Sequence, residues 1–224
     1  MITPIVKVSK GKAVKSFFTL TDYHEWMEST TNHNKWNIKY YKGLGTSTTK
    51  EAKEYFKIMK VTHYTYEDLV SNNSMNLAFS KDKADSRKDW LKMYNPDNVC
   101  DSNSEKITHK TFVDRELIHF SNDDCLRSIP HVMDGLKPSQ RKVLFACFKK
   151  GCYHRKDEVR VAQLAAYTSE HAAYHHGEAS LQGTITGMAQ TFVGSNNINL
   201  LFPQGQFGSR ILGGADAAQP RYIH

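Results

Sequence analysis

A polar, turn-rich stretch near the middle of the chain constrains the fold more than any other sequence feature. It contains Asn95-Pro96-Asp97-Asn98 and Asp101-Ser102-Asn103-Ser104, and such residues favour turns over helices and strands. The chain has 224 residues, of which 39% are hydrophobic, so it can form two ordinary domains, each with its own core. We therefore expect a domain boundary near residues 95–110.

The residues before this boundary carry signals for both strands and helices. The apolar runs 2–8 and 14–20 flank Gly11-Lys12, which predicts a β-hairpin, and a third strand is expected over 36–41. Thr21-Asp22 is a favourable start for a short helix. The first part is therefore expected to be mixed α and β.

Two further helices are predicted before the boundary. Thr48-Thr49-Lys50-Glu51 has the pattern of a capping box, so a helix should run from there to Lys60. Its inner face is expected to carry Ala52, Tyr55, Phe56 and Met59. A second helix is indicated over 77–93.

The residues after the boundary begin with helix signals. Pro138 stands where a first helical residue is favoured. The helices expected here cover residues 112–122, 138–150, 161–172 and 178–192. The last two are separated only by residues 173–177, and Leu181, Ile185, Met188 and Phe192 form one apolar face. This arrangement is typical of a helix-turn-helix.

Apolar residues 198–202 and 211–212, which follow a turn at 194–197, predict the hairpin wing of a winged helix. The glycines Gly205, Gly208 and Gly213 separate these runs. Tyr222-Ile223 is also typical of the start of a strand, so we expect the chain to stop within an element. The predicted fold class is α/β for the first part and α+β for the second.

The charge balance favours an anionic partner. Thirty Lys and Arg against 23 Asp and Glu give a net charge of +7 and a pI near 9.1, which suits nucleic acid or a membrane surface. No apolar run approaches the ~18 residues of a membrane span, and no secretory signal is evident, so we expect a soluble intracellular protein. We expect no membrane partner.

The sequence contains no pattern that favours a metal or nucleotide site. The four cysteines lack paired C-x-x-C spacing, so reduced thiols are expected rather than a zinc site. No D-x-D is present, and the glycines after Lys39-Tyr40-Tyr41-Lys42 match neither phosphate-binding loop pattern. Phosphate or base contact is a better interpretation of His175 and His176 than metal binding, because adjacent histidines diverge.

Arg221-Tyr222 is a candidate catalytic pair. A tyrosine has a pKa near ~10, so its attack on a phosphodiester is helped by a neighbouring cation that stabilises negative charge on the phosphoryl oxygens. The aryl phosphodiester product can reverse the step and reseal the strand. The dipeptide alone is better explained as a strand tyrosine beside a surface arginine.

A basic cluster accompanies the second part. It consists of Lys137, Arg141, Lys142, Lys149 and Lys150, and Lys137 precedes a helix start whose free N–H groups can bind phosphate. A solvated helix face explains the cluster about as well. DNA backbone contact and a solvated face therefore both remain open on charge alone.

The ordered motifs as a set resemble the eukaryotic type IIA DNA topoisomerases. The segments that carry the resemblance are ITPIVKVSK, KYYKGLGTST, KEAKEYF, AFSKDKADSRKDWL, DGLKPSQRKVLF, VAQLAAY, AYHHGEASL, AQTFVGSNNINLL, GQFGSR, GGADAA and PRYI. They run in order over nearly the whole chain and are weakest near 95–110.

This resemblance implies a domain assignment. Residues 1–95 would be the C-terminal part of a Toprim-like domain with its connecting helices, and 96–110 a variable linker. Residues 111–224 would be a winged-helix DNA-binding domain that carries the nucleophile.

The resemblance also implies site residues. Tyr222, in the P-R-Y-I motif, is the implied nucleophile, and Arg221 the transition-state stabiliser. The implied DNA contacts are Arg87, Lys88, Lys137, Tyr174 and Ser180. Charge and placement add Arg141, Lys142, His175 and His176 as further expected DNA contacts.

For the complete enzyme, the resemblance implies a nuclear, ATP-dependent homodimer that acts on double-stranded DNA. Each tyrosine would join a 5′ phosphate and so open a transient double-strand break for duplex passage. Mg²⁺ and ATP would be bound by residues outside this chain, which we expect to be a fragment unable to relax DNA alone. The alternatives are a non-catalytic winged-helix module and a tyrosine recombinase or type IB enzyme, which attaches to a 3′ end.

Overall fold

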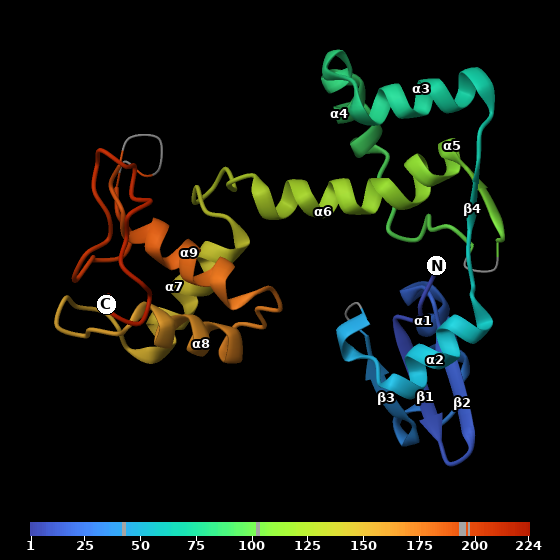
Figure 1. Cartoon of the computed structure of the whole chain (residues 1–224), viewed down its shortest axis with the longest axis horizontal. Helices are drawn as coiled ribbons and strands as arrows, with labels where there is room; N and C mark the ends of the chain where they lie inside the picture. Colours follow the sequence, from blue (N-terminus) through green and yellow to red (C-terminus); the bar gives the residue numbers. More distant parts are fainter. Residues whose placement is uncertain (42–43, 102–103, 193–195, 197) are drawn as a thin grey trace. The chain divides into compact units, whose positions relative to one another are not determined.

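The chain divides into two units within one helix, α6 (Ile118–Ser128). The computed structural model describes residues 1–41, 44–101, 104–192, 196 and 198–224 (Figure 1). The first unit covers Met1–Asp123 and the second Asp124–His224. The sequence places the boundary earlier, near 95–110. Trp90 before that stretch shares a buried cluster with Val113 and Ile118 after it, and this packing joins both sides into one unit.

The first unit begins with a three-stranded antiparallel sheet and a helix. These elements are β1 (Val6–Lys10), β2 (Ala13–Phe17), β3 (Asn37–Tyr40) and α1 (Leu20–Ser29), with strand order β2-β1-β3. The predicted hairpin is confirmed, since Val6 pairs with Phe17 and Lys10 with Ala13. Thr19 caps α1 by accepting the backbone N–H of Asp22 at 3.1 Å.

The predicted capping box is confirmed at the start of α2 (Thr49–Ile58). Thr48 Oγ1 accepts the Glu51 N–H at 3.3 Å, and Glu51 Oε2 accepts the Thr48 N–H at 2.8 Å. The expected inner face is wrong at Phe56, which is 62% exposed, and at Met59, which is 49% exposed. Only Tyr55 is buried on this helix, and Met59 ends it in a left-handed conformation, so the apolar face does not continue.

The remainder of the first unit is mainly helical. Its elements are β4 (His63–Thr65), α3 (Asp68–Phe79), α4 (Ala84–Lys92), β5 (Lys106–Thr108) and α5 (His109–Phe112). The strands β4 and β5 pair in parallel. The single helix predicted over 77–93 is wrong, because the chain turns at 80–83 between α3 and α4. The helix predicted over 112–122 is longer, since α5 continues through a π-helical turn (Val113–Leu117) into α6.

Three helices surround the core of the second unit. They are α7 (Pro138–Lys150), α8 (Val161–His171) and α9 (Glu178–Ala189), and Pro138 begins α7 as predicted. Leu181, Ile185 and Met188 are buried, which confirms the apolar face of the last helix. The helix ends at Ala189, three residues before the predicted end.

The predicted wing strands are wrong for the described residues. Residues 198–224 contain no strand or helix there, and Ile211 is 95% exposed. Backbone hydrogen bonds instead join residues 204–206 to 218–224, through Gln204 with His224 and Ala218 with Gln206. The chain therefore folds its terminal segment, rather than residues 198–202 and 211–212, into a paired arrangement.

Three predicted turns, at 43–45, 101–104 and 194–197, extend outside the described residues. Within the described ranges, no helix is both long and apolar enough to cross a membrane.

Candidate nucleophile and nucleic-acid interface

Tyr222 lies on an irregular segment with its side chain open to solvent. The residue is 64% exposed, and its backbone N–H donates to the Gln219 carbonyl at 2.8 Å. The Arg221 guanidinium carbon lies 4.9 Å from the centroid of the Tyr222 ring. A cation therefore stands beside an accessible phenol, as the candidate catalytic pair requires.

The backbone around Tyr222 is bound to the start of α8. The N–H of Val161 donates to the Ile223 carbonyl, and the N–H of Ala162 donates to the Pro220 carbonyl, each at 3.0 Å. The first N–H groups of a helix lack partners within the helix, so these two carbonyls satisfy them. The residues on either side of the Arg221-Tyr222 pair are thereby held in place.

A second group of candidate residues surrounds a cavity of about 290 Å³, which we call the cationic pocket. Among the residues that line it are five predicted from the sequence: Lys137, Lys142, Tyr174, His176 and Ser180. They come from the start of α7, the segment between α8 and α9, and the first turn of α9. The helix-turn-helix therefore brings together residues that are up to 43 positions apart, from 137 to 180.

The side chains of the cationic pocket are ordered by local contacts. Lys142 Nζ donates to the Ala173 carbonyl at 2.8 Å. The buried Tyr174 ring packs edge-on against His176, with centroids 5.4 Å apart. The N-terminal turns of α7 and α9 line the same cavity, and their partial positive charge favours an anion. The arrangement suits a phosphate group.

Three further lining residues were not predicted from the sequence: Arg127, Ser128 and Ser139. Arg127 also pairs with Asp124 at 2.8 Å, where both side chains are about half exposed. An exposed pair of this kind contributes little stability, so it does not prevent a phosphate contact. A basic residue followed by serine at a helix end was the available signal.

Other expected DNA contacts of the second unit lie elsewhere. Arg141 donates to Asp134 through Nε at 2.6 Å and through Nη2 at 3.0 Å, and it does not line the cationic pocket. This arginine lowers the pKa of Asp134. His175 also lies outside the pocket lining. Lys149 and Lys150 lie in the last turn of α7, roughly 18 Å along the helix from Lys137.

The two candidates of the first unit differ from each other. Arg87 Nη1 donates to the carbonyls of Leu77 at 3.1 Å and Ser80 at 2.6 Å, at the end of α3. Lys88 instead forms an exposed ion pair with Asp85 at 2.8 Å. Arg87 therefore holds a helix end, while Lys88 projects into solvent.

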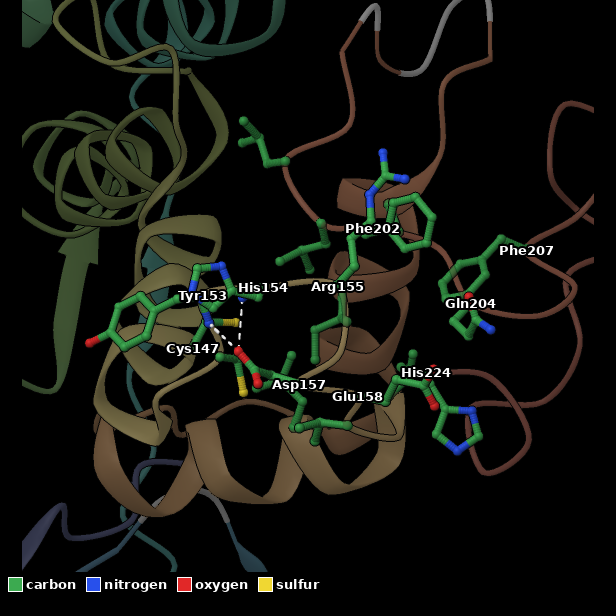
Figure 2. A pocket seen from close by; sticks show the side chains of 18 residues that line it. Cys147, Tyr153, His154, Arg155, Asp157, Glu158, Phe202, Gln204, Phe207 and His224 are labelled. Atoms are coloured by element: carbon green, nitrogen blue, oxygen red, sulfur yellow. Dashed lines mark hydrogen bonds between the residues drawn. The ribbon is translucent and has the colours of Figure 1, made fainter.

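Another cavity of the second unit, of about 270 Å³, has a largely apolar lining (Figure 2). Gln204, Phe207 and His224 line it along one edge, next to the tyrosine segment. Asp157 closes another part by accepting the backbone N–H groups of Tyr153 at 3.1 Å and His154 at 2.8 Å. These bonds lower the pKa of Asp157.

The described residues do not provide a metal site. Within them, no group of three or more His, Cys, Asp or Glu side chains is placed to hold a metal ion. The donor sets of Mg²⁺ are dominated by carboxylates and water. The side chains that we describe therefore do not fit that ion.

Known proteins match both parts of the chain. Residues 1–125 match the family described as the C-terminal associated domain of TOPRIM, and residues 127–224 match a family of DNA gyrase/topoisomerase IV. DNA topoisomerase 2-alpha of Homo sapiens is 51% identical over 99% of this chain. DNA topoisomerase 2 of Caenorhabditis elegans is 52% identical over the same share.

A solved structure is also similar. The DNA-binding, cleavage and re-ligation domain of Plasmodium falciparum topoisomerase II is 50% identical and has a TM-score of 0.74. The match covers 99% of this chain and 30% of that one. The chain spans about 15% of the length of the two curated relatives. With both of its parts matched in order, the chain belongs to the type II DNA topoisomerase family, which confirms the resemblance seen in the sequence.

Proposed function

We propose that this chain forms part of the DNA cleavage and re-ligation core of an ATP-dependent type II DNA topoisomerase, with Tyr222 as the nucleophile. The observation that carries the proposal is the exposed Tyr222 phenol beside the Arg221 guanidinium, on a segment whose backbone is anchored on both sides. An accessible side chain on a fixed backbone is what an attacking group requires, because orientation lowers the barrier.

The proposed step exchanges one phosphodiester for another. The Tyr222 phenol loses its proton as its oxygen bonds to phosphorus, and the bond from phosphorus to the 3′ oxygen breaks. The 3′ oxygen gains a proton, and the 5′ phosphate remains joined to the tyrosine. The reverse attack by the 3′ hydroxyl reseals the strand, so no external energy is needed for re-ligation.

Arg221 stabilises the charge that develops in this step. Its guanidinium lies at the ring of Tyr222, so a phosphoryl group bound to the phenol oxygen would be within the reach of its N–H donors. A planar guanidinium donates two parallel hydrogen bonds to phosphoryl oxygens. Arg221 therefore acts on the transition state rather than on the free phenol.

The cationic pocket positions the duplex. Lys137 and Lys142 supply charge, and the first turns of α7 and α9 supply backbone dipoles to one phosphate. Phosphate contacts set the register of the protein on DNA without reading its sequence. Lys88, Arg87, Arg141 and His175 are proposed as additional contacts outside this pocket.

The domain assignment and the wider assembly are part of the same proposal. Residues 1–95 complete a Toprim-like domain, 96–110 form a linker, and 111–224 form a winged-helix domain around the helix-turn-helix of α8 and α9. The complete enzyme is a nuclear homodimer that uses Mg²⁺ and ATP. Because the described side chains do not fit Mg²⁺, residues elsewhere would hold that ion, which supplies charge stabilisation when bound.

Trapping the covalent intermediate tests this proposal. The full-length protein is incubated with a nicked suicide duplex whose short 3′ fragment dissociates after cleavage, and the adduct is mapped by peptide mass spectrometry. We expect a 5′ phosphate on Tyr222. An adduct on another side chain contradicts the assignment, and a 3′ adduct supports the recombinase alternative.

A non-catalytic DNA-binding module is the second candidate function. The cationic pocket favours it, because phosphate binding there needs no contribution from Tyr222. This candidate predicts salt-dependent DNA binding without any adduct. The trapping experiment separates the two functions, since only the enzyme leaves protein joined to DNA.

A further inference from the structure

The segment around Tyr222 is held by its backbone and by one buried side chain. Ile223 is 1% exposed and belongs to the core cluster that contains Val161 and Leu181. Its neighbour His224 exchanges two backbone hydrogen bonds with Gln204, at 3.0 and 2.9 Å. The core therefore fixes the residue that follows the proposed nucleophile, while the nucleophile itself stays exposed.

Gly205 lies directly against this anchor. Its φ is +108°, in a region that side chains rarely adopt. A Cβ atom on Gly205 would stand 3.2 Å from Ile223 Cγ2 and 3.7 Å from Ile223 Cα. Glycine thus allows the 204–205 backbone to pass close to Ile223 in a conformation that residues with a side chain avoid.

The two ends of the Tyr222 segment are connected to different parts of the unit. The start of α8 binds the carbonyls of Pro220 and Ile223, and the backbone of Gln204 binds His224. A shift of Ile223 would move the adjacent Cα of Tyr222, because consecutive Cα atoms are held at a constant separation. The Ile223 contact is therefore suited to setting where the phenol points.

We propose that Gly205 is a positioning residue for Tyr222, acting through its close contact with buried Ile223. This inference rests on the proposed function of Tyr222. Gly205 needs no contact of its own with DNA or with the phenol for this role. It sets the placement of the attacking oxygen, and small displacements of a reacting group reduce rates strongly.

Gly205→Ala in the full-length enzyme tests the proposal, with Gly213→Ala as the matched control. Gly213 also has a positive φ, of +59°, but a Cβ there would meet nothing within 4 Å. Three quantities are measured for each variant: the single-turnover cleavage rate at saturating suicide duplex, the DNA dissociation constant, and the melting temperature. The rate at saturation separates positioning from binding.

We expect Gly205→Ala to lower the saturated cleavage rate by at least about tenfold with an unchanged dissociation constant. Gly213→Ala should retain the wild-type rate. Equal rates for Gly205→Ala and wild type overturn the positioning role, as do equal losses in both variants. A loss confined to DNA affinity also overturns it.

Ile223→Val keeps the test decisive if Gly205→Ala fails to fold. This change shortens the buried anchor by one methyl group, and it should lower the saturated cleavage rate while DNA affinity stays unchanged. A wild-type rate in a folded Ile223→Val protein overturns the proposal. Absence of any Tyr222 adduct in the wild-type enzyme would instead refute the proposed function itself, which distinguishes the two failures.

Discussion

The basic residues of α4 and those of the cationic pocket carry the same charge but stand in different surroundings. Arg87 binds two carbonyls at the end of α3, and Lys88 pairs with a neighbouring aspartate on an exposed helix face. Lys137 and Lys142 line a cavity that also receives two helix starts. The former group maintains or decorates its own unit, while the latter converges on a space where a ligand fits.

This difference teaches that net positive charge does not identify a binding site by itself. An exposed ion pair such as Lys88–Asp85 is weak and can exchange its carboxylate for a phosphate. Convergent donors around a cavity bind more strongly, because they are already placed before the ligand arrives. Replacing residues of the two groups should therefore have effects of different size.

The largest effect is expected at the exposed tyrosine of the second unit. Tyr222→Phe in the full-length protein should abolish the covalent adduct, because phenylalanine has no oxygen to attack phosphorus, while DNA affinity stays unchanged. Tyr153→Phe is the matched control, since Tyr153 is 65% exposed in the same unit. The measurements are gel-based adduct yield and fluorescence anisotropy. Persistent cleavage by Tyr222→Phe would refute the nucleophile assignment.

A smaller effect is expected at the cationic pocket. Lys137→Ala or Lys142→Ala should each weaken DNA binding by about tenfold and reduce the salt slope by about 1, because one phosphate contact is lost. Lys149→Ala, at the other end of α7, serves as the control. Anisotropy titrations at several salt concentrations give both values. An equal loss in the control would show that overall charge, and not the pocket, determines affinity.

Arg87→Ala should act more on stability than on DNA affinity. It removes the guanidinium that binds the Leu77 and Ser80 carbonyls, and we expect a loss of about 1 kcal/mol in the free energy of unfolding. Lys88→Ala should leave that free energy unchanged. Urea unfolding of both variants measures the difference. A stable Arg87→Ala protein with weakened DNA binding would break the comparison between the two regions.

The smallest effect concerns acid stability of the first unit. Burial raises the pKa of Glu51, but hydrogen bonds from Lys39, Thr48 and Tyr41 outweigh it and lower the pKa from 4.5 to about 2. A lowered folded pKa contributes stability that is complete above pH 4.5 and is lost as the pH falls toward 2. Unfolding measured across this range should show the decline, and Glu51→Gln should flatten it. A decline of equal size in Glu51→Gln would place its origin elsewhere.

Local patterns were sufficient to predict several elements of the fold. The capping box at Thr48 and the proline at position 138 are short-range signals, and both helices begin as expected. The apolar face of Leu181, Ile185 and Met188 was also predictable, because helix periodicity alone determines which residues share a face. These signals depend on residues only a few positions apart.

The candidate site was predictable only in part. Lys137 and Ser180 were identified in the sequence from motif resemblance, whereas Arg127 and Ser139 emerged from packing around the cavity. The wing strands failed for the same reason, since residues 204–206 bond with 218–224 instead of forming the predicted local hairpin. Long-range pairing depends on what else competes for the same backbone groups.

The sequence by itself determined the family, the helix starts and the Arg221-Tyr222 pair. The tertiary structure decided which basic residues converge on a cavity, which are occupied by neighbours, and how Tyr222 is held beside the core. The physical reason is that capping and periodicity operate within one or two helical turns. Cavities and anchors such as Ile223 against Gly205 arise only when distant segments pack together.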